Sequence, residues 1–595
     1  MKIFLPAFCL LLFVHHSSAI SWKCLGCKGA VEAIKFLYKR NATSHEIIEM
    51  AVYMCKHFAD HDSTICRGIT SQFKDSFLYV LEQLLLRPSQ LCGLILNDCG
   101  EAHNPFDGNW SIDLPPKPNI SVPRTHIKVP EKTFRVLQLS DLHFDYSYTP
   151  GSEADCKQPI CCQRQVNVTS LSSTSINKPA GYWGTLASCD VPIWTIENML
   201  QHINRTEKLD YIMLTGDYMS HSDWTYTKEE HLSVIANFST LMQKYFPNTP
   251  VFWGIGNHEG VPVNSLFSFL SSFLYFAPHF APAKFQPKWL TYCYLSRILQ
   301  CVVDRGLKLI SVNTGYCETT NFFLYINQTD PDGTLAWLVS ELYESERANQ
   351  SIHIMAHVPP GDGECLEGWS RNYYRVVNRF ADTIKAQFFG HVHTDAFTVF
   401  YEDMNDYLSQ PTNVLYTAPS VTTFENLNPA YRIYTIDGNY KNSSYEIDDF
   451  ETYFLNLTET KDIDHHPQWK LLYKAKEEYG MTNLSAQSWH DLSQRIRGSK
   501  TVYKKFLKNY ARRTDYPCDT KCHQELLCSL RRGHHNESAL CPSNSVIRKR
   551  VFPTVFQRPF PAVETSVSEP LTRDDFIVST AKKAIWDKIT NWISG

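Results

Sequence analysis

The stretch FRVLQLSDLH, residues 134–143, joins a short apolar run to an aspartate and a histidine. Short apolar runs that alternate with longer amphipathic stretches are typical of α/β domains, in which each run forms a buried strand. The chain keeps this pattern from Phe134 to about Asp437. It predicts strands at Phe134–Leu139, Tyr211–Leu214, Val251–Ile255, Lys308–Val312, Ser351–Met355 and Ala386–Phe389.

Five of the predicted strands run into residue types that bind metal ions. Because the carboxyl ends of strands in an α/β sheet lie at one edge, we expect these side chains to converge. Asp217 is the candidate for a carboxylate that bridges two ions, and imidazoles with an asparagine carbonyl suit zinc better than calcium or magnesium. Two such ions can hold both the attacking and the leaving oxygen of a phosphate ester. The motifs are Asp141-Leu142-His143, Gly216-Asp217, Gly256-Asn257-His258-Glu259, His357 and Gly390-His391-Val392-His393.

In this order the five motifs resemble those of the calcineurin-like metallophosphoesterases. Over residues 131–440 the resemblance implies a catalytic domain with an α/β sandwich of two sheets flanked by helices. It also implies two divalent metal ions, with zinc favoured. A lone histidine such as His353, inside its predicted strand, is better explained as a core residue. The implied ligands are Asp141, His143, Asp217 and His393 for one ion, and Asp217, Asn257, His357 and His391 for the other.

The N-terminus predicts export from the cytosol. Lys2, the apolar run Ile3–Val14 and then Ser17-Ser18-Ala19 follow the pattern of a secretory signal peptide over residues 1–20. No later segment has the roughly 18 apolar residues that span a bilayer, so we expect a soluble mature protein. Removal of Cys9 leaves eighteen of the nineteen cysteines, and an even number suits disulfides in an oxidising compartment. With twelve Asn-x-Ser/Thr sequons, we expect a secreted and/or lysosomal, N-glycosylated protein.

Residues 21–103 contain six cysteines and two helical periodicities. Apolar residues recur at intervals of three and four from Ile47 to Phe58 and from Phe73 to Leu84. This pattern resembles the all-α saposin B-type domain, and a zinc site at Cys24-x-x-Cys27 is not favoured because no second ligand pair follows at finger spacing. A proline-rich linker, extended and semi-rigid, is expected over residues 104–130. The saposin resemblance implies the pairs Cys24–Cys99, Cys27–Cys92 and Cys55–Cys66, which spacing alone does not determine.

Beyond Tyr440 the pattern becomes helical, and a helical C-terminal region stapled by disulfides is expected over residues 441–595. Helices are predicted at Trp469–Tyr479 and Ser499–Tyr510. Near the end an amphipathic stripe favours packing against the body of the protein over contact with a membrane surface. The stripe consists of Ile585, Trp586, Ile589, Trp592 and Ile593.

Further motifs resemble those of the acid sphingomyelinase family. Gly216-Asp217-Tyr218-Met219-Ser220-His221 places a histidine four residues after the aspartate, whereas purple acid phosphatases have a tyrosine ligand where this chain has Ser220. Ala356-His357-Val358-Pro359-Pro360-Gly361 and Asn372-Tyr373-Tyr374-Arg375 are also similar. The resemblance implies the pairs Cys156–Cys161, Cys162–Cys189, Cys317–Cys365, Cys518–Cys522 and Cys528–Cys541, while Cys293 and Cys301 do not match the family and are expected to pair with each other.

This family resemblance implies hydrolysis of sphingomyelin to ceramide and phosphocholine, at acidic pH, by a monomer. The saposin-like domain would contact membrane or lipoprotein surfaces. In this hydrolysis the ceramide oxygen would leave as an alkoxide, which is a poor leaving group, so a general acid is required. His258 is the candidate acid and His221 its partner or a transition-state stabiliser, and the two roles are exchangeable.

Other function classes fit the sequence less well. A nucleotide or small-ester phosphodiesterase with the same metals leaves the saposin-like domain unexplained. A non-catalytic lipid-transfer protein leaves the ligand set unexplained. The formal net charge of −4 gives no reason to expect nucleic-acid binding.

Overall fold

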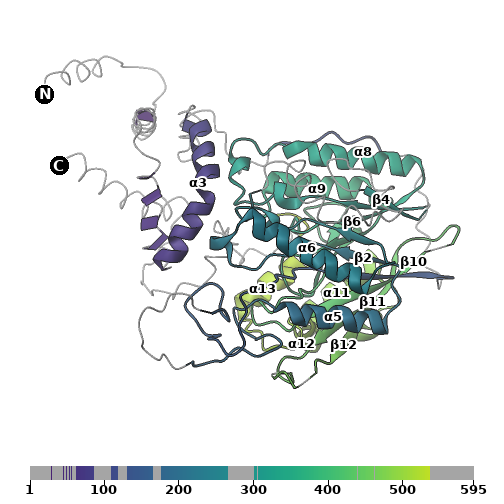
Figure 1. Cartoon of the computed structure of the whole chain (residues 1–595). Helices are drawn as coiled ribbons and strands as arrows, with labels where there is room; N and C mark the ends of the chain where they lie inside the picture. The colour runs from purple at the N-terminus through teal and green to yellow at the C-terminus, as the bar shows by residue number, and fades with distance from the viewer. Residues whose placement is uncertain are drawn as a thin grey trace, which may run out of the picture. The chain divides into compact units, whose positions relative to one another are not determined.

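Two six-stranded β-sheets lie at the centre of the protein (Figure 1). The computed structural model describes scattered residues between 28 and 56, and then residues 62–85, 109–117, 130–164, 176–265, 300–304, 306–438, 440–460, 462–464 and 466–535. The first sheet has the order β12-β11-β10-β1-β2-β3 and the second has the order β4-β5-β6-β7-β9-β8. The strands are β1 (Thr133–Leu139), β2 (Tyr211–Leu214), β3 (Val251–Trp253), β4 (Gln300–Asp304), β5 (Leu307–Ser311), β6 (Ser351–Met355), β7 (Ile384–Phe389), β8 (Ala396–Tyr401), β9 (Pro411–Thr417), β10 (Ala430–Asp437), β11 (Ile447–Leu455) and β12 (Trp469–Lys474).

The six predicted strands form the parallel centre of the two sheets. β1, β2 and β3 pair in parallel, as do β5, β6, β7 and β9. Antiparallel neighbours flank them, with β10 beside β1 and β4 beside β5. All six predictions are confirmed, and no strand end differs by more than two residues. In each sheet the carboxyl ends of the parallel strands therefore lie at one edge, as a site shared between them requires.

Alternate residues of β1 face two different cores. Val136 belongs to a cluster with Met213 and Phe388, which joins the inner faces of the two sheets. Leu137 faces the other way and packs with residues of α5 and α6, since successive side chains of a strand point to opposite faces. On the second sheet, Ile354 packs against α8 and α9. The expected sandwich of two sheets flanked by helices is confirmed (Figure 1), and these helices are α5 (Ile193–Thr206), α6 (Lys228–Tyr245), α8 (Thr334–Arg347) and α9 (Glu367–Arg379).

The predicted helix Trp469–Tyr479 is wrong over its first half. Trp469–Lys474 is strand β12, which pairs with β11. Both strands lie past the expected domain boundary at residue 440, so the region expected to be helical begins with two strands of the first sheet. The register shifts within this pairing, and the buried residues of β12 are Trp469, Leu472 and Tyr473. A β-bulge thus gives a strand the three- and four-residue spacing that is typical of a helix. The remaining residues form α10 (Ala475–Tyr479).

The other described helices of the C-terminal region are α11 (Ala486–Gly498), α12 (Lys500–Tyr510) and α13 (Thr520–Ser529). α12 confirms the helix predicted at Ser499–Tyr510, and the hydroxyl of Ser499 caps it by accepting from the Val502 N–H. α11 carries Trp489, whose ring contacts Phe397 of the second sheet and Phe450 of the first sheet. This helix therefore joins the two sheets at one side of the sandwich.

Five predicted disulfides lie within the described residues, and all five are confirmed. They are Cys55–Cys66, Cys156–Cys161, Cys162–Cys189, Cys317–Cys365 and Cys518–Cys522. Other predictions involve residues outside the described part of the chain. These are the pairs Cys24–Cys99, Cys27–Cys92, Cys293–Cys301 and Cys528–Cys541, the signal peptide at residues 1–20 and the stripe from Ile585 to Ile593.

In the region that resembles a saposin-type domain, the longest described element is α3 (Ser63–Leu85). Its residue Gln72 donates a hydrogen bond from Nε2 to the main-chain oxygen of Tyr226, at 2.8 Å. The rings of Phe73 and Phe322 meet edge to face, with their centroids 5.4 Å apart. Helix α3 therefore packs on loops of the sandwich domain through a mixed polar and aromatic contact.

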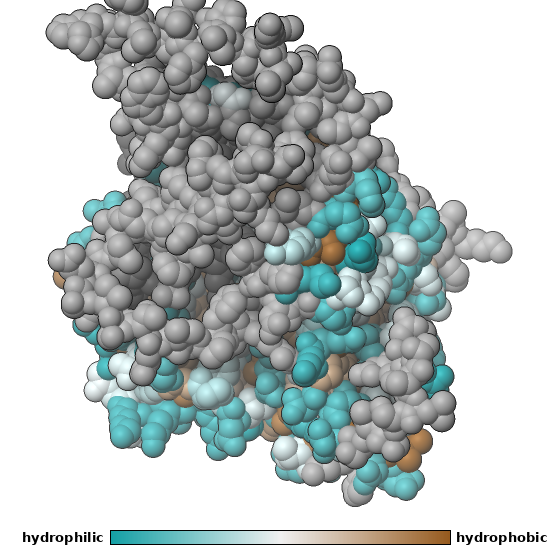
Figure 2. All heavy atoms as spheres, turned by 90° about the vertical axis from the view of Figure 1, so that its left-hand side faces the viewer, coloured by the Kyte–Doolittle hydropathy of each residue, from teal (hydrophilic) through white to brown (hydrophobic). Residues whose placement is uncertain are grey.

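The described surface is mainly polar on the face drawn in Figure 2, where apolar side chains occur as small separate areas. Among the residues that the structure describes, no helix is both long enough and apolar enough to cross a membrane.

We predict that Trp489→Ala destabilises the sandwich. Trp489 is 2% exposed, and its indole N–H donates to the Tyr416 hydroxyl at 3.0 Å. Loss of a buried tryptophan side chain costs about 3–5 kcal/mol. Urea unfolding followed by circular dichroism should show a much lower midpoint for this variant. The control is Tyr343→Ala on the surface of α8, which should change stability by no more than about 0.5 kcal/mol; equal midpoints for the two variants would contradict the assignment of Trp489 to the core.

Candidate metal centre

The loops that follow the strands bring all seven predicted metal ligands together. Asp141, His143, Asp217, His391 and His393 each have a left-handed backbone, with φ between 42° and 73°. Such values are uncommon outside glycine and concentrate at functional sites, where they redirect a side chain. The loop after β1 is held against the loop after β2 by main-chain hydrogen bonds, among them the one from the His143 N–H to the Asp217 oxygen, at 3.1 Å.

Two glycines in the motifs allow the loops to approach the aspartates closely. A β-carbon at position 256 would overlap the carboxylate of Asp217. At position 390 it would overlap the side chains of Ser140 and Asp141. Any residue larger than glycine at position 256 or 390 would therefore have to move a predicted ligand.

The first group of ligand atoms comes from Asp141, His143 and His393. The Nδ1 atom of His143 lies 2.6 Å from the main-chain oxygen of Met219, and that of His393 lies 2.8 Å from the oxygen of Phe424. A carbonyl oxygen only accepts hydrogen bonds, so each Nδ1 carries its proton and each neutral ring presents a lone pair at Nε2. These two Nε2 atoms face each other at 3.1 Å, with Asp141 Oδ1 3.8 Å from the Nε2 of His393.

The second group comes from Asp217, Asn257, His357 and His391. The Nδ1 atom of His357 is 2.8 Å from the main-chain oxygen of Thr215, so Nδ1 carries a proton and Nε2 is the ring atom that faces the site. That Nε2 lies 2.9 Å from Asp217 Oδ2 and 2.9 Å from Asn257 Oδ1. His391 faces the same asparagine oxygen with its Nδ1, at 3.0 Å.

Both groups bring several acceptor side chains together, while main-chain N–H groups donate only to Asp141 Oδ1 and Asp217 Oδ1. Such a concentration of ligand atoms suits a cation. Nitrogen ligands about 2.0–2.1 Å from a tetrahedral zinc ion are roughly 3.3 Å apart, close to the separation of the two facing Nε2 atoms. Asp217 Oδ2 borders both groups, at 2.9 Å from the Nε2 of His357 and 3.6 Å from that of His143. The residues therefore fit two divalent cations with one carboxylate between them.

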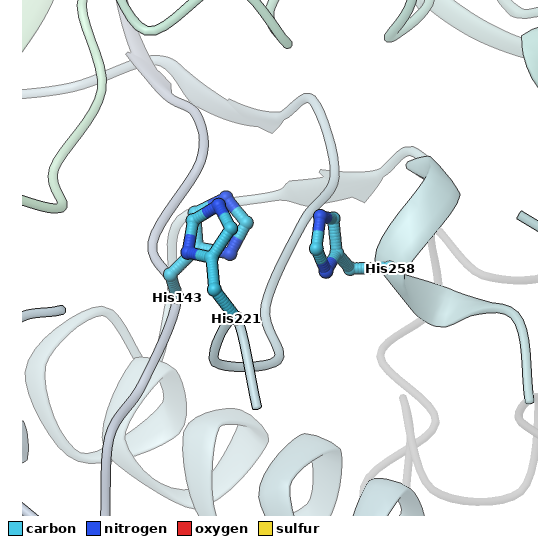
Figure 3. A group of neighbouring side chains, drawn as sticks. All are labelled: His143, His221 and His258. Carbon is cyan, nitrogen blue, oxygen red and sulfur yellow. The ribbon is translucent and has the colours of Figure 1, made fainter. Parts of the chain in front are cut away.

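The two histidines predicted as an acid–base pair lie beside the first group. Figure 3 shows the ring of His221 stacked on the ring of His143, with His258 approaching from η3 (Asn257–Glu259). The ring centroids are 3.9 Å apart for His143 and His221, and 4.8 Å apart for His143 and His258. The other face of His221 stacks on Phe424 at 4.1 Å, and its Nδ1 is 2.8 Å from an oxygen of Asp190.

Two family models and several sequence relatives match most of the chain. Residues 134–395 match the calcineurin-like phosphoesterase family model, and residues 410–544 match the model of the acid sphingomyelin phosphodiesterase C-terminal region. Sphingomyelin phosphodiesterase 1 of Caenorhabditis elegans is 45% identical over 548 residues, which are 87% of this chain and 93% of that protein. The chain belongs to the sphingomyelin phosphodiesterase family. The human sphingomyelin phosphodiesterase is 36% identical over 540 residues, covering 87% of this chain and 82% of its own length.

Solved structures give weaker similarity to this sphingomyelin phosphodiesterase family member. A dimetal phosphatase from Danio rerio matches with a TM-score of 0.33 and 12% identity, over 55% of this chain and 96% of that chain. A score of this size supports no argument about the site. The assignment to the family therefore depends on the sequence relatives and the family models.

Several residues of the centre were missed by the sequence reasoning. Glu259 lies in a quoted motif, and its carboxylate accepts from the N–H groups of Gly256, Asp217 and Tyr218 at 2.7–2.9 Å. Asp190, Asp223, Tyr226 and Glu364 contact the site histidines but belong to no recognised pattern. Tertiary contacts alone bring these four residues to the centre.

Neighbouring groups hold the His258 ring in one orientation. The Tyr226 hydroxyl donates to the main-chain oxygen of Ser220, so it accepts from the Nδ1 of His258, at 2.8 Å. Asp223 Oδ1 lies 3.3 Å from the same Nδ1. The Nε2 atom of His258 is therefore the one left for other partners.

Burial and local charge move the pKa values of the two histidines apart. Burial and the positive charge of His258 lower the pKa of His221 to about 3. Burial also opposes a charge on His258, but the carboxylates of Asp217 and Asp223 outweigh it and raise the pKa of His258 to about 9. Two titratable groups with separated pKa values are what acid–base chemistry requires.

The lone histidine His353 is a core residue, as expected. It is fully buried within β6, and its Nε2 is 2.8 Å from the main-chain oxygen of Tyr445. Burial lowers the pKa of His353 to about 4, so it stays neutral and serves packing.

Proposed function

We propose that this protein hydrolyses sphingomyelin to ceramide and phosphocholine with two divalent metal ions, zinc being the favoured metal. The observation that carries the proposal is the proximity of the seven predicted ligand residues in one site, within a chain of the sphingomyelin phosphodiesterase family. One ion would be held by Asp141, His143, Asp217 and His393, and the other by Asp217, Asn257, His357 and His391.

When bound, the two ions supply charge neutralisation for the phosphate and a water of lowered pKa. The protein contributes ligand orientation. Three ligand histidines are fixed by main-chain carbonyls at Nδ1, and such outer contacts keep the tautomer that leaves Nε2 to the metal. The imidazole Nε2 atoms of His143, His357 and His393 would bind the ions, and Asp217 would contribute its charge to both positions.

The leaving group requires a proton, and we propose that His258 donates it. In the reaction, an oxygen of water forms a bond to phosphorus while the bond from phosphorus to the ceramide oxygen breaks. That ceramide oxygen leaves as an alkoxide unless it is protonated, and the Nε2 of His258 is the group available to protonate it. Asp223 stabilises the imidazolium, and the Tyr226 hydroxyl keeps Nδ1 turned away from the site.

His221 is assigned as the partner of His258. Its Nδ1 lies 2.8 Å from Asp190 Oδ1, which also accepts from the Thr422 hydroxyl at 2.9 Å. With Asp190 ionised, this Nδ1 carries the proton of the neutral ring. A neutral ring held in this way presents an accepting Nε2 next to the acid, where it can accept a hydrogen bond from a water molecule. This assignment gives the charged role to His258 and the neutral role to His221, a choice that the sequence left open.

A lipid substrate is further supported by the region around α3. This amphipathic helix lies in the region that resembles a saposin-type domain, and it exposes Phe77 and Tyr79 by 40% and 44%. One side of each ring also contacts Phe322 or Phe323 of the sandwich domain. Exposed aromatic side chains on a helix suit the interface between water and lipid. We propose that the region over residues 21–103 contacts the membrane or lipoprotein surface that presents sphingomyelin.

A secreted or lysosomal location is supported by the confirmed disulfides and by the sequons. All eight sequon asparagines in the described residues are at least partly exposed. They are Asn109, Asn204, Asn237, Asn327, Asn349, Asn442, Asn456 and Asn483. Glycans require such accessible positions, so we propose an N-glycosylated protein of an oxidising compartment.

The substrate is tested by comparing sphingomyelin in anionic liposomes with a soluble phosphodiester such as bis(p-nitrophenyl) phosphate. We expect phosphocholine release from liposomes to dominate, and Asp217→Asn to reduce it by at least about 10³-fold, since one charge serves both ions. The control Asp406→Asn, in an exposed loop, should retain activity. Turnover of the soluble ester alone would indicate a small-ester or nucleotide phosphodiesterase, and sphingomyelin binding without hydrolysis would indicate a lipid-transfer protein.

The role of His258 predicts a pH effect. A group with a raised pKa stays protonated below that pKa and loses its proton as pH rises through it, so kcat should fall on the alkaline side. Asp223→Asn removes one of the charges that raise the pKa of His258, and we expect the alkaline limb of kcat to move down by roughly 1–3 pH units. The profile of Asp406→Asn should match the wild type. An unmoved limb in Asp223→Asn would remove His258 from the role of acid.

A further inference from the structure

One metal ligand, His391, is oriented differently from the other histidines of the centre. His143, His357 and His393 use Nδ1 to contact main-chain carbonyls. His391 instead turns Nδ1 toward Asn257 and leaves Nε2 outward, 3.2 Å from the carboxylate of Glu364. The Nε2–H of His391 therefore needs an acceptor on the side away from the metal site. The carboxylate of Glu364 is that acceptor, where the other three histidines use a main-chain carbonyl.

A second buried carboxylate supports Glu364. Glu318 is fully buried, and one oxygen each of Glu318 and Glu364 lies within 4.8 Å of a ring nitrogen of His391. The disulfide Cys317–Cys365 joins the residues next to these glutamates, and the N–H of Thr319 donates to the Glu364 main-chain oxygen at 2.7 Å. The two carboxylates are thus fixed relative to each other by covalent and main-chain contacts.

A directed chain of hydrogen bonds leads from Glu318 to the asparagine ligand. The Thr320 hydroxyl donates to Glu318 Oε1 at 3.2 Å and accepts from Asn264 Nδ2. Asn264 Oδ1 in turn accepts from Asn257 Nδ2 at 2.8 Å. Glu318 Oε1 also accepts from the Thr320 N–H at 3.3 Å, so this oxygen is the acceptor at the end of the chain. The Thr320 hydroxyl and the two amides then each have one donor direction, and Asn257 is left with Oδ1 toward the metal.

We propose that Glu318 and Glu364 are positioning residues for the second metal site, and that they select the ligand atoms of Asn257 and His391. Glu364 holds the proton of His391 on Nε2, which leaves Nδ1 as the ligand atom. Glu318 orients the amide of Asn257 through Thr320 and Asn264. The first site, with His143 and His393, has no such contacts among the described residues and does not depend on the pair. This inference builds on the two-metal site of the proposed function.

The variants Thr320→Val and Glu364→Gln test the two branches separately. Thr320→Val keeps the shape of the side chain but removes the hydroxyl, so Asn264 and Asn257 lose their fixed orientation. Glu364→Gln removes the charge behind His391. Outer-shell substitutions of this kind weaken metal binding by about 10–100-fold. Conservative variants, Thr320→Ser and Glu364→Asp, keep the hydroxyl or the carboxylate and should restore binding.

The measurement is metal content by mass spectrometry after dialysis of the full chain against increasing chelator. We expect the wild type to contain two ions and to release them in two steps as the chelator concentration rises. In each test variant only the step that belongs to the second metal site should move, to a chelator concentration about 10–100-fold lower. The matched control is Glu341→Gln, a buried glutamate 3.2 Å from Lys308 and remote from the centre, which should leave both steps unchanged.

Three results would overturn the inference. Release as in the wild type from both test variants would show that the pair does not support metal binding. Equal movement of both steps would show general loosening of the domain. Three ions in the wild type, with one lost from Glu364→Gln, would make the pair a ligand set of its own. A different result concerns the proposed function alone. A wild-type protein that holds two ions but does not hydrolyse sphingomyelin would refute the proposed substrate and leave the positioning roles in place.

Discussion

The rest of the structure depends on the convergence of hydrogen-bond acceptors at the edge of the two sheets. His143, His357 and His393 each commit Nδ1 to a main-chain carbonyl, so three Nε2 atoms point into a buried space. The carboxylate of Asp217 is directed into the same space, with Oδ2 2.9 Å from the Nε2 of His357 and 3.6 Å from that of His143. Buried acceptors without donors are costly, and cations are the groups that turn this arrangement into a stable one.

The sandwich makes that convergence possible. Parallel strands bring their carboxyl ends to the same edge, and the shared core between the sheets fixes one edge against the other. Left-handed backbones after β1, β2 and β7 then turn the side chains inward, and glycines at 256 and 390 leave room for them. Trp489 of α11 contacts both sheets, so the C-terminal region helps to keep the two halves of the metal centre in register.

The sequence was sufficient for six strands, those of the parallel centre except β9, and for bringing the predicted ligand residues to one site, because both follow local rules. A buried run such as Tyr211–Leu214 is apolar throughout, and the ligand types stand directly after it. It was insufficient at β12, where a bulge gave a strand the spacing of a helix. It also gave no signal for Asp190, Asp223 or Glu364, because a carboxylate that contacts a histidine only in three dimensions has no spacing to recognise.

The most direct test of the account is anomalous diffraction from crystals of the full chain, recorded at the absorption edge of the metal found by elemental analysis. The account predicts two peaks, one between His143 and His393 and the other between His357 and His391, with Asp217 in contact with both. A single peak, or two peaks of which only one contacts Asp217, would contradict the shared carboxylate and with it the proposed two-metal chemistry.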